Sequence, residues 1–313
     1  MPTAVSLFTG CGGSDVGVIN AGFEVLMAND ILPYAQDVYQ ANHQETDYIV
    51  DRIENIKSFP KSELLVGCYP CQGFSQGGLR QANSKINTLY VEFSRALNTI
   101  KPKAFIVENV SGMVRSNYQH LLADQIRVFT EAGYKVTYKV LNAAEYGVPQ
   151  ERKRIFIVGV SDAFDIEYQF PLPTHGITAA NRVRTIKDAL IGLPEWPEGE
   201  YYDHDFHWYY MSRNRRRNWE EPSKTIVANP RHMPLHPVSP TLEKIETDVW
   251  KFTNHQKARR FSYPEAARLQ GFDGLVFPNT EKFGMNMCYT VVGNAVPPPL
   301  FEAVTKALPD IWD

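Results

Sequence analysis

The feature that most constrains the fold is a short apolar segment that runs directly into a glycine-rich turn. Residues 4–8 are almost wholly apolar, and residues 9–17 then contain four glycines before a helical stretch that reaches Ala21. A strand, a glycine turn and a helix in this order suit a nucleotide-like ligand, because glycines let the ligand approach the backbone and the helix N-terminus offers free N–H groups. Tight packing of the turn would explain the same glycines, so both interpretations stay open at this point.

A second apolar segment, residues 23–28, ends at Asn29 and Asp30. An acidic residue about 20 positions after a glycine turn, at the end of the next strand, suits the two hydroxyl groups of a ribose. Asp30 would equally serve as a cap for the following helix, and its position alone does not separate the two roles. No lysine follows the glycines, which excludes a Walker-type phosphate loop.

The segment Pro70-Cys71-Gln72 follows the end of another buried strand, residues 63–66. Glycines at positions 73, 77 and 78 argue against a regular element there and leave a loop, residues 72–87, that can close over a substrate. A cysteine at a strand end is well placed for a nucleophile, because the strand fixes its backbone. We therefore interpret Cys71 as the candidate nucleophile and the loop as its lid.

Two further strands carry charged residues at one end. Residues 104–107 are apolar and lead into Glu108, which should lie at the same sheet edge as Cys71 and the glycine turn, although a solvated carboxylate fits this position as well. Arg152 and Arg154 precede the apolar residues 155–159 and share a parity, so they should point to the same side. Their guanidinium groups need an anion or a carbonyl, and a structural salt bridge would satisfy them as well as a substrate would.

These segments predict an α/β fold, and the 313 residues leave room for one large domain and a smaller one. From about residue 170 the composition changes: prolines punctuate short segments that are rich in Tyr, Trp and His. We interpret this region as an irregular second domain inserted into the first.

The formal net charge of −3 predicts no general affinity for nucleic acid, so any such surface must be local. The inserted region offers one, because five arginines lie between positions 213 and 231 with aromatic residues among them. Arginine is the preferred side chain for bidentate contacts with guanine. A run of charge is often only a solvated face, but arginines without balancing acids favour nucleic acid.

The four cysteines, Cys11, Cys68, Cys71 and Cys288, are too few for a disulfide scaffold. We find no signal peptide and no apolar run long enough for a membrane span, which indicates a reducing cytoplasm. Cys68 and Cys71 form a Cys-x-x-Cys pair typical of thiol redox proteins, but the glycines that follow argue against the helix such motifs begin. We expect no metal, since Cys11 and Cys288 supply no second close pair.

Taken together, the segments resemble the cytosine-5 DNA methyltransferase family of bacterial restriction-modification systems over nearly the whole chain. Six blocks match in the family's order: Phe8-Thr9-Gly10-Cys11-Gly12-Gly13, Pro70-Cys71-Gln72, Glu108-Asn109-Val110, Gln150-Glu151-Arg152-Lys153-Arg154, Arg268-Leu269-Gln270-Gly271-Phe272 and Gly293-Asn294-Ala295-Val296-Pro297. Each block alone is ambiguous, whereas six in order are specific. The resemblance implies a Rossmann-like domain that uses S-adenosyl-L-methionine, formed by residues 1–175 and 279–313. A mostly irregular and β target-recognition domain, residues 176–278, would be inserted into it.

The resemblance also implies roles for individual residues. Catalysis would rest on Cys71, Glu108, Arg152 and Arg154. Cofactor-binding positions would be Phe8, Gly10, Gly12, Asp30, Asp51, Pro70, Leu89, Asn294 and Ala295. DNA would be contacted by Ser75, Gln76, Arg213, Arg215, Arg217 and Arg231.

This chain departs from the family pattern at three positions. Tyr69 precedes Pro70 where many relatives have a second proline, and Pro264 stands at a helix start where a basic residue is common. The acidic residue that receives the adenine amino group corresponds to Asp51, although the alignment could equally place Arg52 there.

The implied reaction is methyl transfer to carbon-5 of cytosine in a short GC-rich palindrome of double-stranded DNA, by base flipping and covalent catalysis. The variable region supports this through a likeness to bacterial enzymes with short recognition domains, carried by Met211-Ser212-Arg213-Asn214-Arg215. We expect a cytoplasmic monomer that acts on nucleoid DNA, with a cognate endonuclease acting separately. Two alternatives are an RNA cytosine-5 methyltransferase, whose Cys-Phe-Thr tripeptide is missing from this sequence, and a catalytically silent DNA-binding relative.

Overall fold

The computed structural model describes residues 1–70, 89–115 and 118–312. The chain divides into two compact units. Unit 1 comprises Met1–Asn142, Lys153–Leu172 and Pro298–Asp313, and unit 2 comprises Ala143–Arg152 and Pro173–Pro297. This division follows the contacts within the chain and does not show what each unit does. The assignment of residues 176–278 to target recognition therefore stays a prediction.

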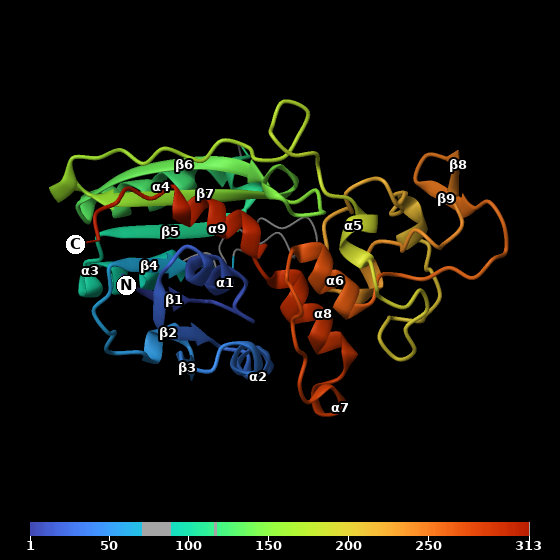
Figure 1. The fold of residues 1–313 in the computed structure, drawn as a ribbon, viewed down its shortest axis with the longest axis horizontal. Coiled ribbons are helices and arrows are strands. Elements are labelled where there is room, and N and C mark those ends of the chain that lie inside the picture. The colour runs from blue at the N-terminus through green and yellow to red at the C-terminus, as the bar shows by residue number, and fades with distance from the viewer. Residues whose placement is uncertain (71–88, 116–117, 313) are drawn as a thin grey trace. The chain divides into compact units, whose positions relative to one another are not determined.

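In its described part, unit 1 is built on a seven-stranded sheet with the order β3-β2-β1-β4-β5-β7-β6 (Figure 1). The strands from β3 to β5 in this order pair in parallel, whereas β7 runs antiparallel to both β5 and β6. The strands span Thr3–Leu7 (β1), Glu24–Asp30 (β2), Asp47–Val50 (β3), Leu64–Gly67 (β4), Ala104–Val110 (β5), Tyr134–Asn142 (β6) and Lys153–Ser161 (β7).

The central strands β4 and β5 are continuous apolar runs, as expected where helices cover both faces of a sheet. The sequence predicted that the apolar strand at residues 104–107 terminates in Glu108-Asn109-Val110. In the structure β5 continues through Val110, because β7 still pairs with this segment, with Glu108 opposite Phe156 and Asn109 opposite Ile155. Glu108 therefore lies among the last residues of the strand, as predicted.

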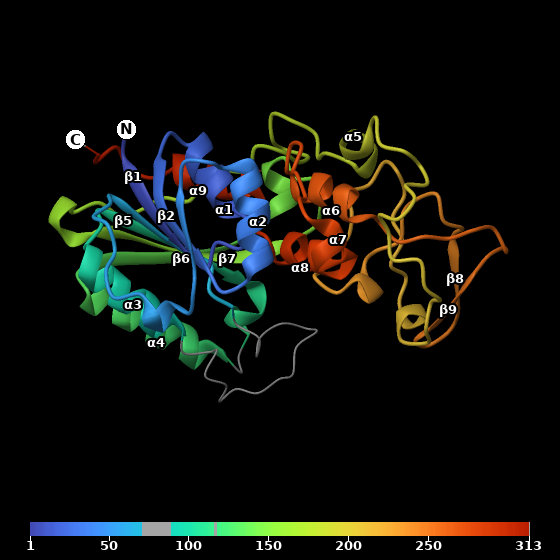
Figure 2. The same ribbon diagram turned by 90° about the horizontal axis from the view of Figure 1, so that it is seen from below.

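Helices cover both faces of the sheet (Figure 2). α1 (Gly13–Asn20) and α9 (Pro298–Lys306) lie on one face, and α3 (Leu89–Ile100) and α4 (Gln119–Glu131) lie on the other, while α2 (Pro33–Asn42) packs on β2 and β3. α1 and α9 approach closely at Gly17, where an added Cβ would lie 2.7 Å from the backbone nitrogen of Glu302. The last helix of the chain therefore packs against the first one.

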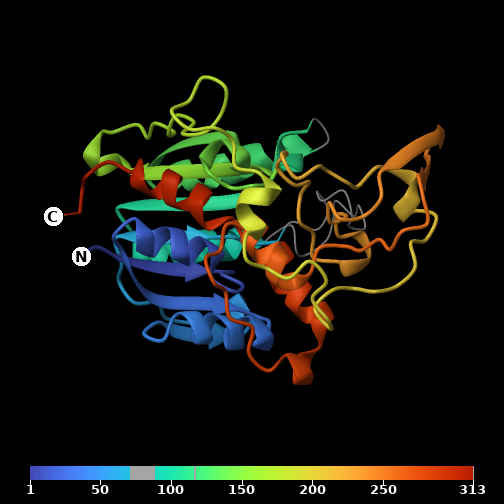
Figure 3. The same cartoon turned by 45° about the vertical axis from the view of Figure 1, so that its right-hand side comes forward.

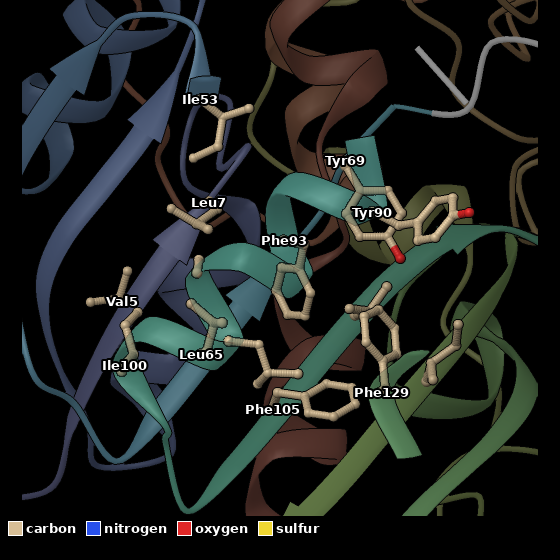
Figure 4. Packing of buried hydrophobic residues seen from close by; sticks show 14 of the residues in the cluster. Val5, Leu7, Ile53, Leu65, Tyr69, Tyr90, Phe93, Ile100, Phe105 and Phe129 are labelled. Atoms are coloured by element: carbon tan, nitrogen blue, oxygen red, sulfur yellow. The ribbon is translucent and has the colours of Figure 1, made fainter. Parts of the chain in front are cut away.

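Aromatic rings form the centre of the core between the sheet and the α3–α4 face (Figure 4). Phe105 of β5 meets Phe129 of α4 with ring centroids 5.0 Å apart, and Phe93 of α3 lies 5.6 Å from Phe129. Both pairs are edge-to-face, the geometry that aromatic quadrupoles favour.

Unit 2 consists mainly of irregular chain around short elements, as predicted. Its elements are α5 (Ile186–Leu190), β8 (Leu242–Glu246), β9 (Val249–Phe252), α6 (Tyr263–Gln270), α7 (Thr280–Phe283) and α8 (Met285–Asn294). β8 and β9 form an antiparallel hairpin, orange in Figure 3. A capping box begins α6: the side chains of Ser262 and Glu265 each accept the other residue's backbone N–H, and Gly271 ends the helix in a left-handed conformation.

Within the described residues, no helix has the length and apolar character needed to cross a bilayer.

The packing at Gly159 gives a first testable prediction. An added Cβ at Gly159 would lie 2.1 Å from Cε1 of Phe105. Gly159→Ala should therefore lower the free energy of unfolding by about 1–3 kcal/mol through overpacking, measured by denaturant titration. In the double variant Gly159→Ala/Phe105→Leu the smaller ring makes room, so its loss should be less than the sum of the two single losses. Strict additivity would contradict this account.

Candidate functional site

The glycine turn after β1 adopts backbone conformations that explain its composition. Gly10 and Gly12 have φ values of 57° and 90°, which favour glycine. At Gly12 an added Cβ would lie 2.8 Å from the Tyr39 ring, whereas beside Gly10 nothing lies within 4 Å of that position. Packing therefore accounts for Gly12, while Gly10 borders open space that a ligand can use. Phe8 also has a positive φ, 60°, and is half-buried at the start of the same turn.

Asp30 lies directly beside this turn. The parallel register of β1 and β2 pairs Leu7 with Asn29, so the end of β2 meets the end of β1. One carboxylate oxygen of Asp30 accepts the N–H of Gly10 at 3.0 Å, and the other accepts the N–H of Leu32, also at 3.0 Å. Burial raises the pKa of the Asp30 carboxyl, and these backbone hydrogen bonds oppose the shift. The predicted ribose-binding acid is thus hydrogen-bonded directly to the predicted glycine turn.

Asp51 and Arg52, the two candidates for the adenine-binding position, have different contacts in the structure. The N–H of Asp51 donates to the carbonyl of Asp30, and the buried amide of Asn29 donates to the carbonyl of Asp51. The exposed side chain of Arg52 pairs instead with Glu54 at 3.0 Å. Asp51 is thereby tied to the end of β2, and its contact with an adenine stays a prediction.

The remaining cofactor positions are distributed over both units. Leu89 is half-buried at the start of α3, and Pro70 is exposed at the end of a described segment. Asn294 and Ala295 belong to unit 2, where Asn294 is the exposed last residue of α8 and Ala295 is buried.

Glu108 and Arg154 form a buried ion pair. Arg154 lies opposite Val110 in the β5–β7 pairing, which places its guanidinium beside Glu108 with Nε and Oε1 2.9 Å apart. Glu108 is 7% exposed. Burial lowers the pKa of Arg154, and the carboxylate of Glu108 opposes this shift. The structure thus brings together Glu108 and Arg154, two of the predicted catalytic residues. The salt bridge that the sequence analysis considered for Arg154 is present.

The chain that leads to Cys71 is held beside this pair. Cys68 donates its N–H to the carbonyl of Leu7, and Asn109 donates its side-chain amide to the carbonyl of Tyr69 at 3.0 Å. The hydroxyl of the buried Tyr69 donates to Gln125 at 2.6 Å. Cys71, Ser75, Gln76 and the predicted lid lie outside the described residues.

The thiol of Cys68 is poorly suited to redox chemistry. Burial raises its pKa well above the usual range, and the nearby Glu108 carboxylate adds to this. Redox-active Cys-x-x-Cys pairs depend instead on a lowered thiol pKa. Among the described residues, no group of three His, Cys, Asp or Glu side chains could hold a metal ion.

Arg152 has partners that differ from those of Arg154. It is 2% exposed, belongs to unit 2 and donates to the carbonyls of Ile226, Gly293 and Ala295. Arg152 therefore ties together segments of unit 2, whereas Arg154 pairs with a carboxylate of unit 1. The even spacing of Arg152 and Arg154 in the sequence, which predicted that both point to the same side, gave no indication that their partners differ.

Gln150 is a structural residue for which the sequence analysis assigned no role. It is fully buried and donates to the carbonyl of Leu269 and the side chain of Gln270, while its own oxygen accepts the N–H of Ile226. Its position at the start of the family block that contains Arg152 was the feature of the sequence that could have indicated this role. Gly293 has a related packing role, because an added Cβ would lie 2.2 Å from the backbone nitrogen of Ala228.

The predicted DNA-contacting arginines are not equivalent. Arg213 is exposed, with its guanidinium 5.8 Å from the Tyr209 ring centroid, and Arg215 is half-buried, 5.0 Å from that of Tyr210. Arg217 is paired with Glu151 at 2.6 Å and with Glu221 at 3.0 Å. The assumption that the arginines lack balancing acids is therefore wrong for Arg217.

Arg231 lies at a polar pocket of unit 2. The pocket has a volume of about 510 Å³, and the exposed Arg231 donates to the Tyr202 hydroxyl at 3.1 Å in its lining. The other lining residues are Ala228, Asn229, Pro230, Asn286 and Thr290.

Trp208 is a surface aromatic residue that the sequence analysis did not single out. Its side chain is 81% exposed, which is unusual for a tryptophan, and its indole lies 5.7 Å from the Tyr209 ring. The buried Arg260 holds this segment: its guanidinium lies 4.3 Å from the Phe206 ring and donates to the carbonyl of His204. The aromatic run before the arginines was the signal that could have identified it.

Comparison with known families matches residues 3–310 to the family described as C-5 cytosine-specific DNA methylase. Among curated proteins, the chain is 37% identical to the Type II methyltransferase M.FnuDI of Fusobacterium nucleatum, covering 97% of this chain and 93% of that protein. It is 34% identical to the Type II methyltransferase M.NgoPII of Neisseria gonorrhoeae, covering 97% and 94%.

Solved structures share the fold. One described as a DNA modification methyltransferase encoded within an E. coli prophage has a TM-score of 0.71 at 20% identity and covers 98% of each chain. A Spodoptera frugiperda DNMT2 variant also has a TM-score of 0.71, at 16% identity, covering 98% of this chain and 99% of its own. The match to the family over nearly the whole length, together with the curated relatives, shows that the chain belongs to the C-5 cytosine-specific DNA methylase family.

Proposed function

We propose that this DNA cytosine-5 methyltransferase works through Cys71, Glu108 and Arg154. The observation that carries the proposal is the buried Glu108–Arg154 pair, which lies where the chain leaves β4 towards Cys71. A carboxylate and a guanidinium held 2.9 Å apart and largely shielded from water offer a fixed acceptor and donor to a planar base. The family resemblance assigns the nucleophile role to Cys71.

Carbon-5 of cytosine is a weak nucleophile, so a covalent step must activate it. In the proposed reaction the Cys71 thiolate adds to carbon-6 and moves electron density to carbon-5. Glu108 binds N3 and the exocyclic amine, where charge changes during the addition, and Arg154 holds the O2 oxygen. S-adenosylmethionine, when bound, supplies an electrophilic methyl group. Carbon-5 takes this methyl group, and loss of its proton to solvent then allows elimination of the Cys71 thiolate from carbon-6. Arg152 holds segments of unit 2 together.

The residues of the glycine turn fit S-adenosylmethionine, the cofactor of this family. Open space borders Gly10, and the Asp30 carboxylate at the end of β2 has the chemistry that ribose hydroxyls require. We assign to cofactor binding Phe8, Gly10, Gly12, Asp30, Asp51, Pro70, Leu89, Asn294 and Ala295.

Double-stranded DNA is the substrate, and we propose that residues 176–278 recognise it. The target carbon is inaccessible inside a stacked duplex, so the cytosine must be flipped out, with Ser75 and Gln76 filling its place. We assign guanine contacts to Arg213, Arg215 and Arg231, and a stacking contact to Trp208. Arg217 is engaged by two carboxylates, and we propose that it orders the segment instead of reading a base.

We propose that the enzyme methylates a short GC-rich palindrome as a cytoplasmic monomer on nucleoid DNA. A separate endonuclease that cuts the same site would complete a restriction-modification system, in keeping with the Type II names of the curated relatives. Those relatives do not favour the RNA-modifying alternative or the catalytically silent one.

Methyl transfer from labelled S-adenosylmethionine to unmethylated bacterial genomic DNA, followed by base-resolution mapping of 5-methylcytosine, tests the proposal. Wild-type protein should methylate one short palindrome, and Cys71→Ala should lose turnover entirely while keeping duplex binding. Methylation by the Cys71→Ala variant would disprove covalent catalysis by this residue. Label transferred to tRNA in a parallel reaction would instead support the RNA alternative.

Alkylation of the native protein tests which thiol is reactive. Burial raises the pKa of Cys11 to about 12 and that of Cys68 well above the usual range, so both stay protonated at pH 7.5. A short treatment with iodoacetamide, followed by peptide mass mapping, should label Cys71 first. Labelling of Cys68 should rise only at strongly alkaline pH. Equal rates at Cys68 and Cys71 near neutral pH would contradict the assignment.

Guanine reading can be tested with 7-deazaguanine, which lacks the N7 acceptor that arginine uses. At a guanine read by Arg213, the analogue should weaken DNA binding by the wild type by about 1–3 kcal/mol. It should have little further effect on DNA binding by Arg213→Ala, which has already lost the contact. The same comparison applies to Arg215 and Arg231. Arg217→Ala is the matched control, because it should retain the full effect of the analogue at every position. Loss of the effect only in Arg217→Ala would reverse these assignments.

A further inference from the structure

Two side chains hold the peptide groups on either side of Gly10. The Gly10 N–H donates to Asp30 at 3.0 Å, and the Gly10 carbonyl accepts the hydroxyl of Tyr48 at 2.9 Å. Tyr48 lies on the edge strand β3, is 5% exposed and pairs with Ala28 of β2. Glycine at positive φ allows wide rotation of its flanking peptides, and each of these two side-chain hydrogen bonds restrains one of them.

The ring of Tyr48 connects this contact to the second half of the turn. It lies 4.8 Å from the Tyr39 ring, and Tyr39 in turn occupies the space next to Gly12. The Tyr39 hydroxyl donates to the fully buried carboxylate of Asp15 at 2.8 Å, on the helix that the turn begins. Gly10, Gly12 and the start of α1 are thus held by one connected group of side chains.

We propose that Tyr48 is a positioning residue for S-adenosylmethionine. Its hydroxyl keeps the peptide between Gly10 and Cys11 in one orientation, so that the open space beside Gly10 exists before the cofactor arrives. Without the hydroxyl this peptide loses one restraint on its orientation, and cofactor binding must then order it at a cost in affinity. The inference rests on the proposed role of Gly10 and Asp30 in cofactor binding.

Tyr48→Phe tests this role because it keeps the ring packing and removes only the hydroxyl. Isothermal titration with S-adenosylhomocysteine should show a Kd about fivefold higher than that of the wild type, the value expected for one net hydrogen bond. The KM for S-adenosylmethionine should rise by a similar factor, with kcat unchanged at saturation. Hydrogen exchange of the amides in the turn should also be faster in the free variant.

Tyr134→Phe and Tyr168→Phe are matched controls. Each of these buried tyrosines of unit 1 donates its hydroxyl to a backbone carbonyl at 2.8 Å, Tyr134 to Pro102 and Tyr168 to Val304. Their Phe variants should lower Tm about as much as Tyr48→Phe does, while leaving the Kd unchanged. An unchanged Kd in Tyr48→Phe, or an equal rise in the controls, would overturn the inference.

Asp30→Ala separates this inference from the proposed cofactor site. If Asp30→Ala loses binding while Tyr48→Phe binds normally, only the role of Tyr48 fails. If Asp30→Ala binds as the wild type does, the ribose contact fails, and the comparison of Tyr48→Phe with Tyr134→Phe still decides whether Tyr48 acts on the cofactor.

Discussion

The candidate site of unit 1 depends on strand pairing that brings several chain segments to one edge of the sheet. β1, β2, β4 and β5 are parallel, so the glycine turn, Asp30, the segment leading to Cys71 and Glu108 all lie near the same edge. β7 runs in the opposite direction, which brings its first residues and Arg154 to that edge as well. One pattern of backbone hydrogen bonds thus collects groups that are far apart in sequence.

Arg152 and Arg154 show how strongly the surroundings decide what an arginine does. Both guanidinium groups are largely removed from water, which is costly unless they have partners. Three carbonyls satisfy Arg152 and make it a structural connection, while a carboxylate satisfies Arg154 and leaves a charged pair suited to binding a base. Residues two positions apart in one family block therefore have separate tasks.

Unit 2 has few strands, and buried side chains supply much of its hydrogen bonding. Arg259 makes two 2.7 Å bonds to Glu265, whose carboxylate also caps α6, so the buried charges are paired in bidentate geometry. His236 lies 3.4 Å from the same carboxylate, but burial lowers its pKa to about 3 and it stays neutral. Such contacts replace the backbone ladder that a sheet would provide. Arg260 holds the irregular segment that carries Trp208 in the same way.

Local patterns in the sequence determined most strands of unit 1, the glycine turn and the helix that follows it, because these depend on neighbouring residues. The order of the six motif blocks along the chain identified the family. Tertiary structure alone decided that Arg152 donates to carbonyls of unit 2, that Arg217 is neutralised by Glu151 and Glu221, and that Tyr48 reaches the Gly10 carbonyl. These contacts depend on strand order and on packing between distant segments, which no local periodicity encodes.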